Sequence, residues 1–457
     1  MAIRFPEHSQ QTQAPTPTST VVNPAPLWQW QSFQLGLLVF FGLPSLGAVL
    51  LGISKLGLIG RFWHQWRRQP LVQVWGILFV LMLGGSAMAI APLDALLGMA
   101  NIIPFGLLVT ALIYLIRTPT QLWRISQIML IAGSPMLLLG LGQLFGDWST
   151  PTWLNSLLGW SLIAGGNPPG RMAAMLMYAN LFACYLLVLL CLAGGLWLTV
   201  YRQWQQQPTP TLGWQLAGLT LALLGNGTGV FLAHSRNAWA LAVIAFLGFC
   251  LYLGWYWLVG LAVGGVGIVA WASWLPSWGG TVLRQVVPSI LWSRLSGEMY
   301  PDEQTEILRS VQWRFCWQLI QERPLTGWGL RSFESLYNNG PHAVNHYHWV
   351  AHPHNVWMML GAELGIPLTL ALCVWGAWCC YPLVRRFWQF PVSDRPILFS
   401  YLLAFGMVCG FNLLDVSLFD FRTNCLGWLL LGVIAGIGRS ALPSRSPQVE
   451  ASTDLAL

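Results

Sequence analysis

Long apolar stretches recur along the whole chain, and most are close to the 20 or so residues that a helix needs to cross a bilayer. Only 8% of the 457 residues are charged, whereas soluble domains carry about 25%. We place the spans at 33–53, 71–93, 95–116, 125–145, 172–200, 213–232, 238–255, 257–277, 356–380, 398–418 and 424–438. The sequence therefore predicts a multi-spanning membrane protein.

The expected fold class is all-α: a polytopic transmembrane helix bundle of 11–12 spans with a long outer-face loop that contains short surface helices. The number depends on Pro44, because 33–60 is either one span or a short helical hairpin. The expected organisation is a disordered tail at 1–32, transmembrane parts at 33–277 and 356–438 around a loop at 278–355, and a cytoplasmic tail at 439–457.

Basic residues cluster in three short loops, at 54–70, 117–124 and 381–396. The spans between them let all three lie on one side of the membrane, which the positive-inside rule assigns to the cytoplasm. The segments 146–171, 233–237, 278–355 and 419–423 then face outward.

The outer loop contains an expected amphipathic helix within 305–329, with apolar residues at roughly helical spacing and a stop before Pro324. Arg309 and Arg314 lie on this helix, but five residues apart they cannot both point at one target. One of them is therefore expected to be solvated.

Five of the eight histidines lie between 342 and 354, just before an apolar run. Asn355 is a candidate N-cap for a helix that opens at Val356. A helix start disfavours a protonated imidazole, so His354 is a candidate neutral general base. Two other interpretations stay open: polar loop side chains, or a metal site from the pairs His346/His348 and His352/His354, although no Cys or carboxylate lies among them in the sequence.

Two further arginines lie at the outer ends of spans. Arg236 occupies the short turn AHSRN, where a charge near membrane depth usually faces a cavity or a partner, and its planar fork suits a phosphate. Snorkelling to the interface is the alternative. Arg171 follows GGNPPG, whose Gly and Pro indicate irregular backbone near a ligand or a lipid headgroup.

Several kinds of chemistry have no motif in this chain. It has no Walker-type or G-x-G-x-x-G loop and no D-x-D pair, so we expect neither a nucleotide cofactor nor a metal. The net charge of +7 is scattered among loops, which does not indicate nucleic-acid binding. Of the few acidic residues, Glu363 is expected to pair within the bundle, and Asp415 and Asp420 to offset Arg422.

Taken together, these motifs resemble the O-antigen ligase and lipid-linked polysaccharide polymerase superfamily. The resemblance lies in H-N, nine intervening residues and then G (354–365), in R-S-V-Q-W (309–313) with P-L-T-G-W-G (324–329), and in SRNAW (235–239) and GNPPG (166–170). The combination covers roughly residues 160–370.

The resemblance implies a glycosyltransferase of a bacterial inner membrane, without metal or nucleotide sugar. Its partners would be a lipid-linked glycan donor on undecaprenyl diphosphate, a glycan or lipid acceptor hydroxyl, and membrane lipids. By the same motifs His354 would be the base, and Arg236 and Arg309 would bind the departing diphosphate. The substrate-binding residues would be Asn355, Arg171, Arg314, Trp313 and Trp328. Ligase and polymerase remain equally open.

Two other functions remain open. One is an inorganic-carbon (bicarbonate) transporter, a label carried by a branch of this superfamily, in which Arg236 and Arg171 would line an anion path. The other is a sensor or binding protein whose histidines hold a metal or respond to pH. A transporter places its site near the bilayer midplane, whereas these residues gather on the outer face, which favours the enzyme.

Overall fold

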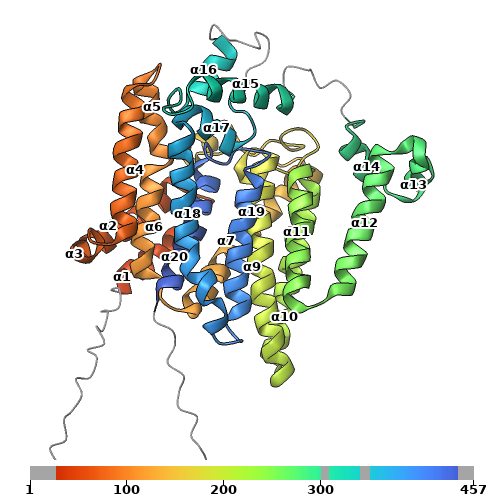
Figure 1. The fold of residues 1–457 in the computed structure, drawn as a ribbon. Coiled ribbons are helices and arrows are strands. Elements are labelled where there is room, and N and C mark those ends of the chain that lie inside the picture. The colour runs from red at the N-terminus through yellow and green to blue at the C-terminus, as the bar shows by residue number, and fades with distance from the viewer. Residues whose placement is uncertain (1–26, 300–307, 340–349, 441–457) are drawn as a thin grey trace, which may run out of the picture.

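The computed structural model describes residues 27–299, 308–339 and 350–440, and within these ranges it is built of helices without strands (Figure 1). The first half contains α1 (Leu27–Phe40), α2 (Pro44–Arg61), α3 (Trp63–Trp66), α4 (Pro70–Ala87), α5 (Pro92–Gly98), α6 (Ile103–Leu115), α7 (Pro119–Phe145), α8 (Thr152–Leu158), α9 (Ala179–Gln206) and α10 (Pro210–Leu232). The second contains α11 (Arg236–Leu253), α12 (Tyr256–Trp274), α13 (Gly280–Val286), α14 (Ser289–Ser296), α15 (Arg309–Glu322), α16 (Ser332–Asn339), α17 (Val356–Leu364), α18 (Ile366–Arg386), α19 (Arg395–Phe411) and α20 (Phe421–Arg439).

Among the described residues, nine helical segments are long and apolar enough to cross a membrane: α4, α5 with α6, α7, α9, α10, α11, α12, α18 and α20. A further apolar helix, α19, is shorter. The all-α polytopic bundle is thus confirmed, and the chain is a multi-pass membrane protein. From the sequence we expect eleven or twelve spans, more than these nine, for two reasons. Helix α19 is shorter than a full span, and the expected first span is divided between α1 and α2.

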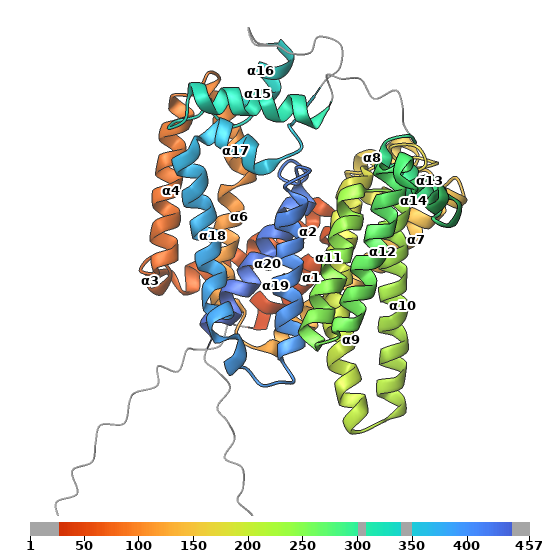
Figure 2. The ribbon, with the colours of Figure 1, turned by 45° about the vertical axis from the view of Figure 1, so that its right-hand side comes forward.

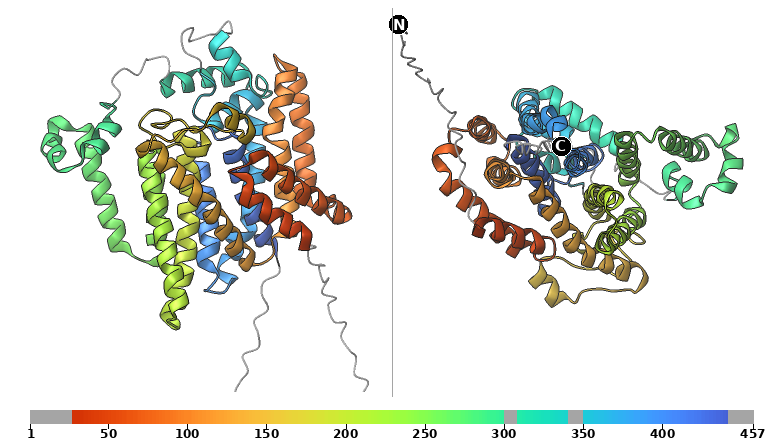
Figure 3. Two further views of the ribbon diagram at one scale, coloured as in Figure 1. Left: turned by 180° about the vertical axis from the view of Figure 1, so that it is seen from behind. Right: turned by 90° about the horizontal axis from the view of Figure 1, so that it is seen from below.

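The first segment is a helical hairpin rather than one span. Helices α1 and α2 pack along each other, and a Cβ at Gly47 would overlap the backbone of Phe40, so this close approach requires glycine. Helix α1 begins at Leu27, so part of the expected 1–32 tail is helical, and the rest of that tail lies outside the described residues. The hairpin lies against α6 and α7, as Figure 3 shows from behind.

The ends of the spans fall into two groups. The basic segments 54–70, 117–124 and 381–396, which include helix ends and the short α3, lie at the lower side of Figure 1, whereas the 233–235 turn and helices α15 to α17 lie at the upper side. This grouping is the one that the charge pattern predicts, with the lower side as the cytoplasm. The outer loop helix is also confirmed, because α15 ends at Glu322 and buries Phe315, Leu319 and Ile320.

The expected span at 356–380 is wrong as one continuous helix. It breaks at Gly365, which has φ +79°, and Pro367 then opens α18. The segment 324–329 fills the break: the N–H groups of Trp328 and Gly329 donate to the Ala362 and Glu363 carbonyls (3.0 and 2.9 Å), and that of Ile366 donates to the Pro324 carbonyl (2.8 Å). The terminal carbonyls of α17 are therefore satisfied inside the protein.

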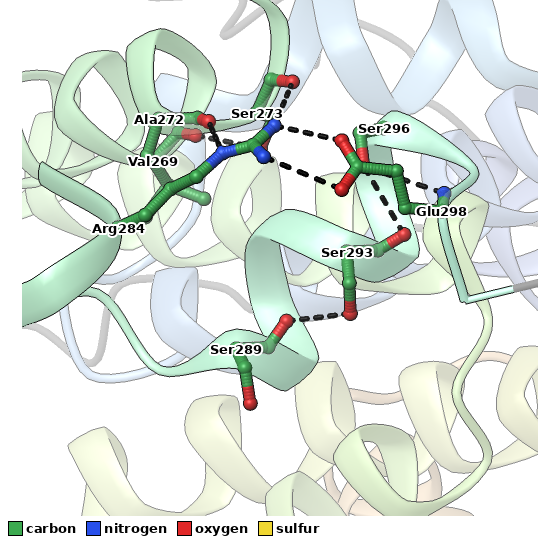
Figure 4. A network of polar contacts seen from close by, with 8 residues as sticks. All are labelled: Val269, Ala272, Ser273, Arg284, Ser289, Ser293, Ser296 and Glu298. Atoms are coloured by element: carbon green, nitrogen blue, oxygen red, sulfur yellow. Dashed lines mark hydrogen bonds and ion pairs between the residues drawn. The ribbon is translucent and has the colours of Figure 1, made fainter. Parts of the chain in front are cut away.

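Helix α12 stands apart from the rest of the bundle, with α13 and α14 at its outer end (Figures 1 and 3). Arg284 closes this end by donating from Nε to the Ala272 carbonyl (2.8 Å) and by pairing with Glu298 (2.8 Å), as Figure 4 shows. Exposed aromatic residues occupy both ends of α12, as expected for a lipid-facing helix. They are Trp255, Tyr256 and Trp257 at one end and Trp271, Trp274 and Trp278 at the other.

Replacing Gly365 with alanine is expected to destabilise the protein. The added Cβ would overlap the Leu325 carbonyl oxygen and would hold a non-glycine residue at φ +79°. Such a conformation costs on the order of 1–3 kcal/mol, so the midpoint of thermal unfolding in detergent should fall by several degrees. Gly376→Ala is the matched control, because its Cβ would meet nothing within 4 Å. Equal midpoints for the two variants would contradict this account of the helix break.

Candidate functional site at the outer face

Helix α15 holds the segment that leads into α17, and it lies across the outer end of the bundle above α17 (Figure 2). The indole N–H of Trp313 donates to the Pro353 carbonyl (2.9 Å), and the Gln312 side-chain oxygen lies 3.0 Å from Nδ1 of His354. The Asn355 side chain accepts from the Met358 N–H (3.0 Å), which confirms the predicted N-cap. His354 is thus fixed from both sides, at φ +54°.

These contacts decide which nitrogen of His354 is basic. With the Gln312 amide oxygen facing Nδ1, the tautomer that makes this hydrogen bond carries its proton on Nδ1 and keeps the lone pair on Nε2. Burial, the neighbouring His352 and the charge of Arg309 together lower the pKa of His354 to about 3, and burial is the largest of the three causes. The imidazole is therefore neutral at ordinary pH, as the sequence-based argument expects of a base at a helix start.

A carboxylate completes the cluster, and it comes from a distant part of the chain. One nitrogen each of His352 and His354 and one oxygen of Asp415 all lie within 4.8 Å of one another. Asp415 is buried and accepts from the Asn180 side chain (2.6 Å). The expectation that Asp415 offsets Arg422 is wrong; Asp420 does so, at 3.5 Å.

The same three side chains offer the ligand types of a two-histidine, one-carboxylate metal site. The sequence contains no carboxylate near the histidines, and the fold supplies one. Two competing bonds restrain these groups: Nδ1 of His354 faces Gln312, and Asp415 accepts from Asn180. A cation would therefore use Nε2 of His354, the same atom that a base would use.

Three arginines lie close to one tyrosine beside this cluster. Burial raises the pKa of the Tyr178 hydroxyl, Asp415 raises it further, and the charges of Arg171, Arg309 and Arg294 oppose both effects. Arg171 and Arg294 are themselves buried. Guanidinium groups from three separate segments thus gather around Tyr178, where they attract anionic ligands, and the charge of Arg309 also acts on His352 and His354.

The turn between α10 and α11 is held by two of these arginines. Nε of Arg171 donates to the Ala233 carbonyl (2.9 Å), and Nε of Arg294 donates to the His234 carbonyl (3.2 Å). Arg236 begins α11 directly after this turn, half-buried, and it forms no hydrogen bond or ion pair with another described residue. The structure therefore confirms the turn but gives Arg236 no contact with the histidine cluster.

The remaining sequence candidates have different surroundings. Arg314 is exposed on α15. The Trp328 indole N–H donates to the Leu319 carbonyl (2.9 Å), and Arg323 lies 4.1 Å over its ring, so this residue already packs within the protein and its substrate role stays a prediction. His342, His346 and His348 lie outside the described residues.

Four neighbours of the site were missed by the sequence argument: Gln312, Asn180, Arg294 and Asp415. Gln312 is the easiest to find in retrospect, because it lies inside the R-S-V-Q-W run and is a fully buried polar residue on the same face of α15 as Phe315 and Leu319. The other three come from elements whose closeness to His354 depends on tertiary structure.

An apolar cavity of about 440 Å³ begins just below the site, in the part of the bundle formed by α17, α18, α19 and α20. Its outer end is lined by Val356, Asn412 and Ser417, and its deeper wall includes Trp375 and Trp428. Val356 donates to the Asn412 carbonyl (3.0 Å), so the cavity and the N-cap of α17 share a wall.

These features define a multi-pass membrane protein with a polar, arginine-rich site at the outer end of its helices and an apolar cavity beneath. Residues 219–373 match the sequence model of the O-antigen ligase family. The match covers about a third of the chain, and over these residues it supports the resemblance seen in the motifs. The match includes Arg236, Arg294, Arg309 and His354, whereas Arg171 and Asp415 lie outside it. No curated protein matches the chain.

His354 is expected to stay neutral in acid. Because its folded pKa is lowered to about 3, the proton remains on Nδ1 alone down to about pH 5, where an ordinary histidine with a pKa near 6.5 is charged. Nitrogen-15 NMR of histidine-labelled protein, with His354→Asn to assign the signal, measures the state. Arg309→Gln removes one cause of the lowered pKa and should shift the titration to higher pH. A His354 signal that titrates near pH 6.5 in both proteins would contradict this site geometry.

Proposed function

We propose that the protein is a membrane glycosyltransferase of the O-antigen ligase type, in the inner membrane of a bacterium. It would transfer a glycan from an undecaprenyl diphosphate carrier to an acceptor hydroxyl on the outer face. The observation that supports this most is the pairing of a neutral His354, with Nε2 unprotonated, and Arg309, whose charge reaches that imidazole.

In the proposed reaction, the acceptor oxygen attacks the anomeric carbon of the donor sugar. Its proton moves to Nε2 of His354, a new glycosidic bond forms, and the bond between the sugar and the diphosphate breaks. The lipid diphosphate leaves with the electron pair. Arg309, with Arg171 and Arg294 beside Tyr178, would stabilise the negative charge that develops on the leaving group. Arg236 is kept as a further candidate for this role on the strength of its motif.

The apolar cavity supports a lipid-linked donor rather than a soluble one. It lies between span helices directly below the polar groups, so a carrier with a diphosphate at the arginines would have its prenyl chain next to an apolar wall. The cavity holds only a part of such a chain, and the rest would lie in the bilayer.

A metal-binding protein is the second candidate, because His352, His354 and Asp415 could share an ion. The two candidates predict different responses to a chelator. The glycosyltransferase proposed here is metal-independent, so it should keep its rate after chelation, whereas a metal enzyme or sensor would lose its activity or response.

The first test is acceptor-dependent release of undecaprenyl diphosphate from a lipid-linked oligosaccharide by purified protein in proteoliposomes. His354→Ala should lower the rate by about 10²–10⁴, the usual contribution of a general base. Arg309→Gln should lower it by about 10²–10³, as the loss of one group that stabilises developing charge. Chelator should change neither the rate nor these ratios.

The control is a double variant, His346→Ala with His348→Ala, which removes two histidines of the run but keeps the proposed base. It should release the carrier like the unmodified protein. If several donors and acceptors give no release, or if the double variant fails as severely as His354→Ala, the enzyme proposal is wrong. Bicarbonate uptake by the same vesicles would then favour the transporter.

Substitutions of Gln312 test separately how the orientation and the tautomer of the His354 imidazole are fixed. Gln312→Met removes the acceptor at Nδ1 and should lower kcat by about 10–100-fold with little change in KM, as for other groups that orient a reactive imidazole. Gln312→Glu keeps an acceptor and adds a negative charge, so it should retain more activity and move the acid limb of the pH profile to higher pH. Equal losses and an unshifted profile in both variants would assign Gln312 a purely structural role.

A further inference from the structure

A second cavity, this one lined by polar and charged residues, lies at the opposite end of the bundle, near the lower ends of α4, α18 and α20 in Figure 1. It measures about 500 Å³, and its wall includes Arg385, Arg386 and Arg439. Nothing in the proposed reaction uses this cavity, because the histidine cluster is at the other end of the same helices.

Among the described residues, no carboxylate forms an ion pair with the positive charges of this cavity. Nη1 of Arg386 donates to the carbonyls of Gly438 (2.9 Å) and Ser440 (2.8 Å), and Nη2 of Arg439 donates to that of Trp378 (2.9 Å). Carbonyl oxygens accept hydrogen bonds but leave the net charge in place. Arg385 is exposed and, like these two, forms no ion pair with a described residue. Three guanidinium groups therefore keep their charge around one cavity.

The cavity also lies at the depth of a membrane surface. Its residues come from the beginning of one candidate span, 70–87, and from the ends of two others, 366–389 and 421–439. Trp378 and Tyr381 add partly exposed aromatic rings to the wall, a residue type that is typical of the headgroup level. Basic pockets between span helices on the cytoplasmic side are suited to anionic headgroups.

We propose that this cavity binds the headgroup of an anionic phospholipid of the cytoplasmic leaflet. The phosphate would lie against Arg385, with Arg386 and Arg439 held in place behind it by their carbonyl bonds. A lipid is favoured over a soluble anion, because the opening lies at the span ends, where acyl chains can continue along α18 into the bilayer. The lipid would link α4, α18 and α20 at the end of the bundle away from the reaction.

Lipid retention tests the proposal directly and does not require the glycan reaction. The full chain is reconstituted in phosphatidylcholine vesicles that contain a minor fraction of phosphatidylglycerol, and bound lipid is counted by native mass spectrometry after extraction. Arg385→Gln is the test variant, since this side chain makes no hydrogen bond that the fold needs. Arg124→Gln is the matched control, an exposed arginine at the same end of the bundle but outside the cavity.

The unmodified protein and Arg124→Gln should retain phosphatidylglycerol in preference to phosphatidylcholine. Arg385→Gln should bind it about fivefold more weakly, the factor expected for one basic residue next to an anionic leaflet. Added inorganic phosphate should not displace the lipid. Equal retention by the two variants, no preference for phosphatidylglycerol, or displacement by phosphate would each overturn the proposal, the last in favour of a soluble anion.

Discussion

Backbone groups inside a bilayer have no water to bond with, and this constraint determines where the chain can depart from helix. The break at Gly365 illustrates it, since the carbonyls left open at the end of α17 are satisfied by N–H groups of the 324–329 segment. The 233–235 turn illustrates it again, because its carbonyls accept from Arg171 and Arg294. At the outer end the irregular backbone is thus satisfied within the protein, and the candidate functional side chains lie on it or beside it.

Three residues of α15 surround His354, and each has a different effect on it. On α15, Trp313 fixes the backbone at Pro353, Gln312 sets the tautomer of the imidazole, and Arg309 adds positive charge nearby. About one turn of an amphipathic helix therefore positions the candidate base and a candidate anion-binding arginine together. The apolar face of the same helix, with Phe315 and Leu319, is what holds it to the bundle.

Much of this site can be predicted from the sequence, because helix caps, turns and helix ends are determined by residues close together in the chain. The N-cap at Asn355, the turn before Arg236 and the end of α15 before Pro324 each depend on residues within a few positions of one another, and all three are confirmed. The signals that failed are long-range ones. Nothing near Asp415 in the sequence indicates His352 and His354 as its neighbours, and the continuous apolar run at 356–380 hides the break at Gly365.

The low pKa of His354 has a consequence for the order of events. An imidazole with a pKa of about 3 is neutral but weakly basic, so the free protein is poorly suited to take a proton from a hydroxyl. A negative charge about 6 Å away, at an effective dielectric constant of about 20, raises such a pKa by about 2 units. In the proposed reaction, a diphosphate bound at Arg309 would bring such a charge. Donor binding would therefore strengthen the base, and the acceptor would be activated only when a sugar is in place to receive it.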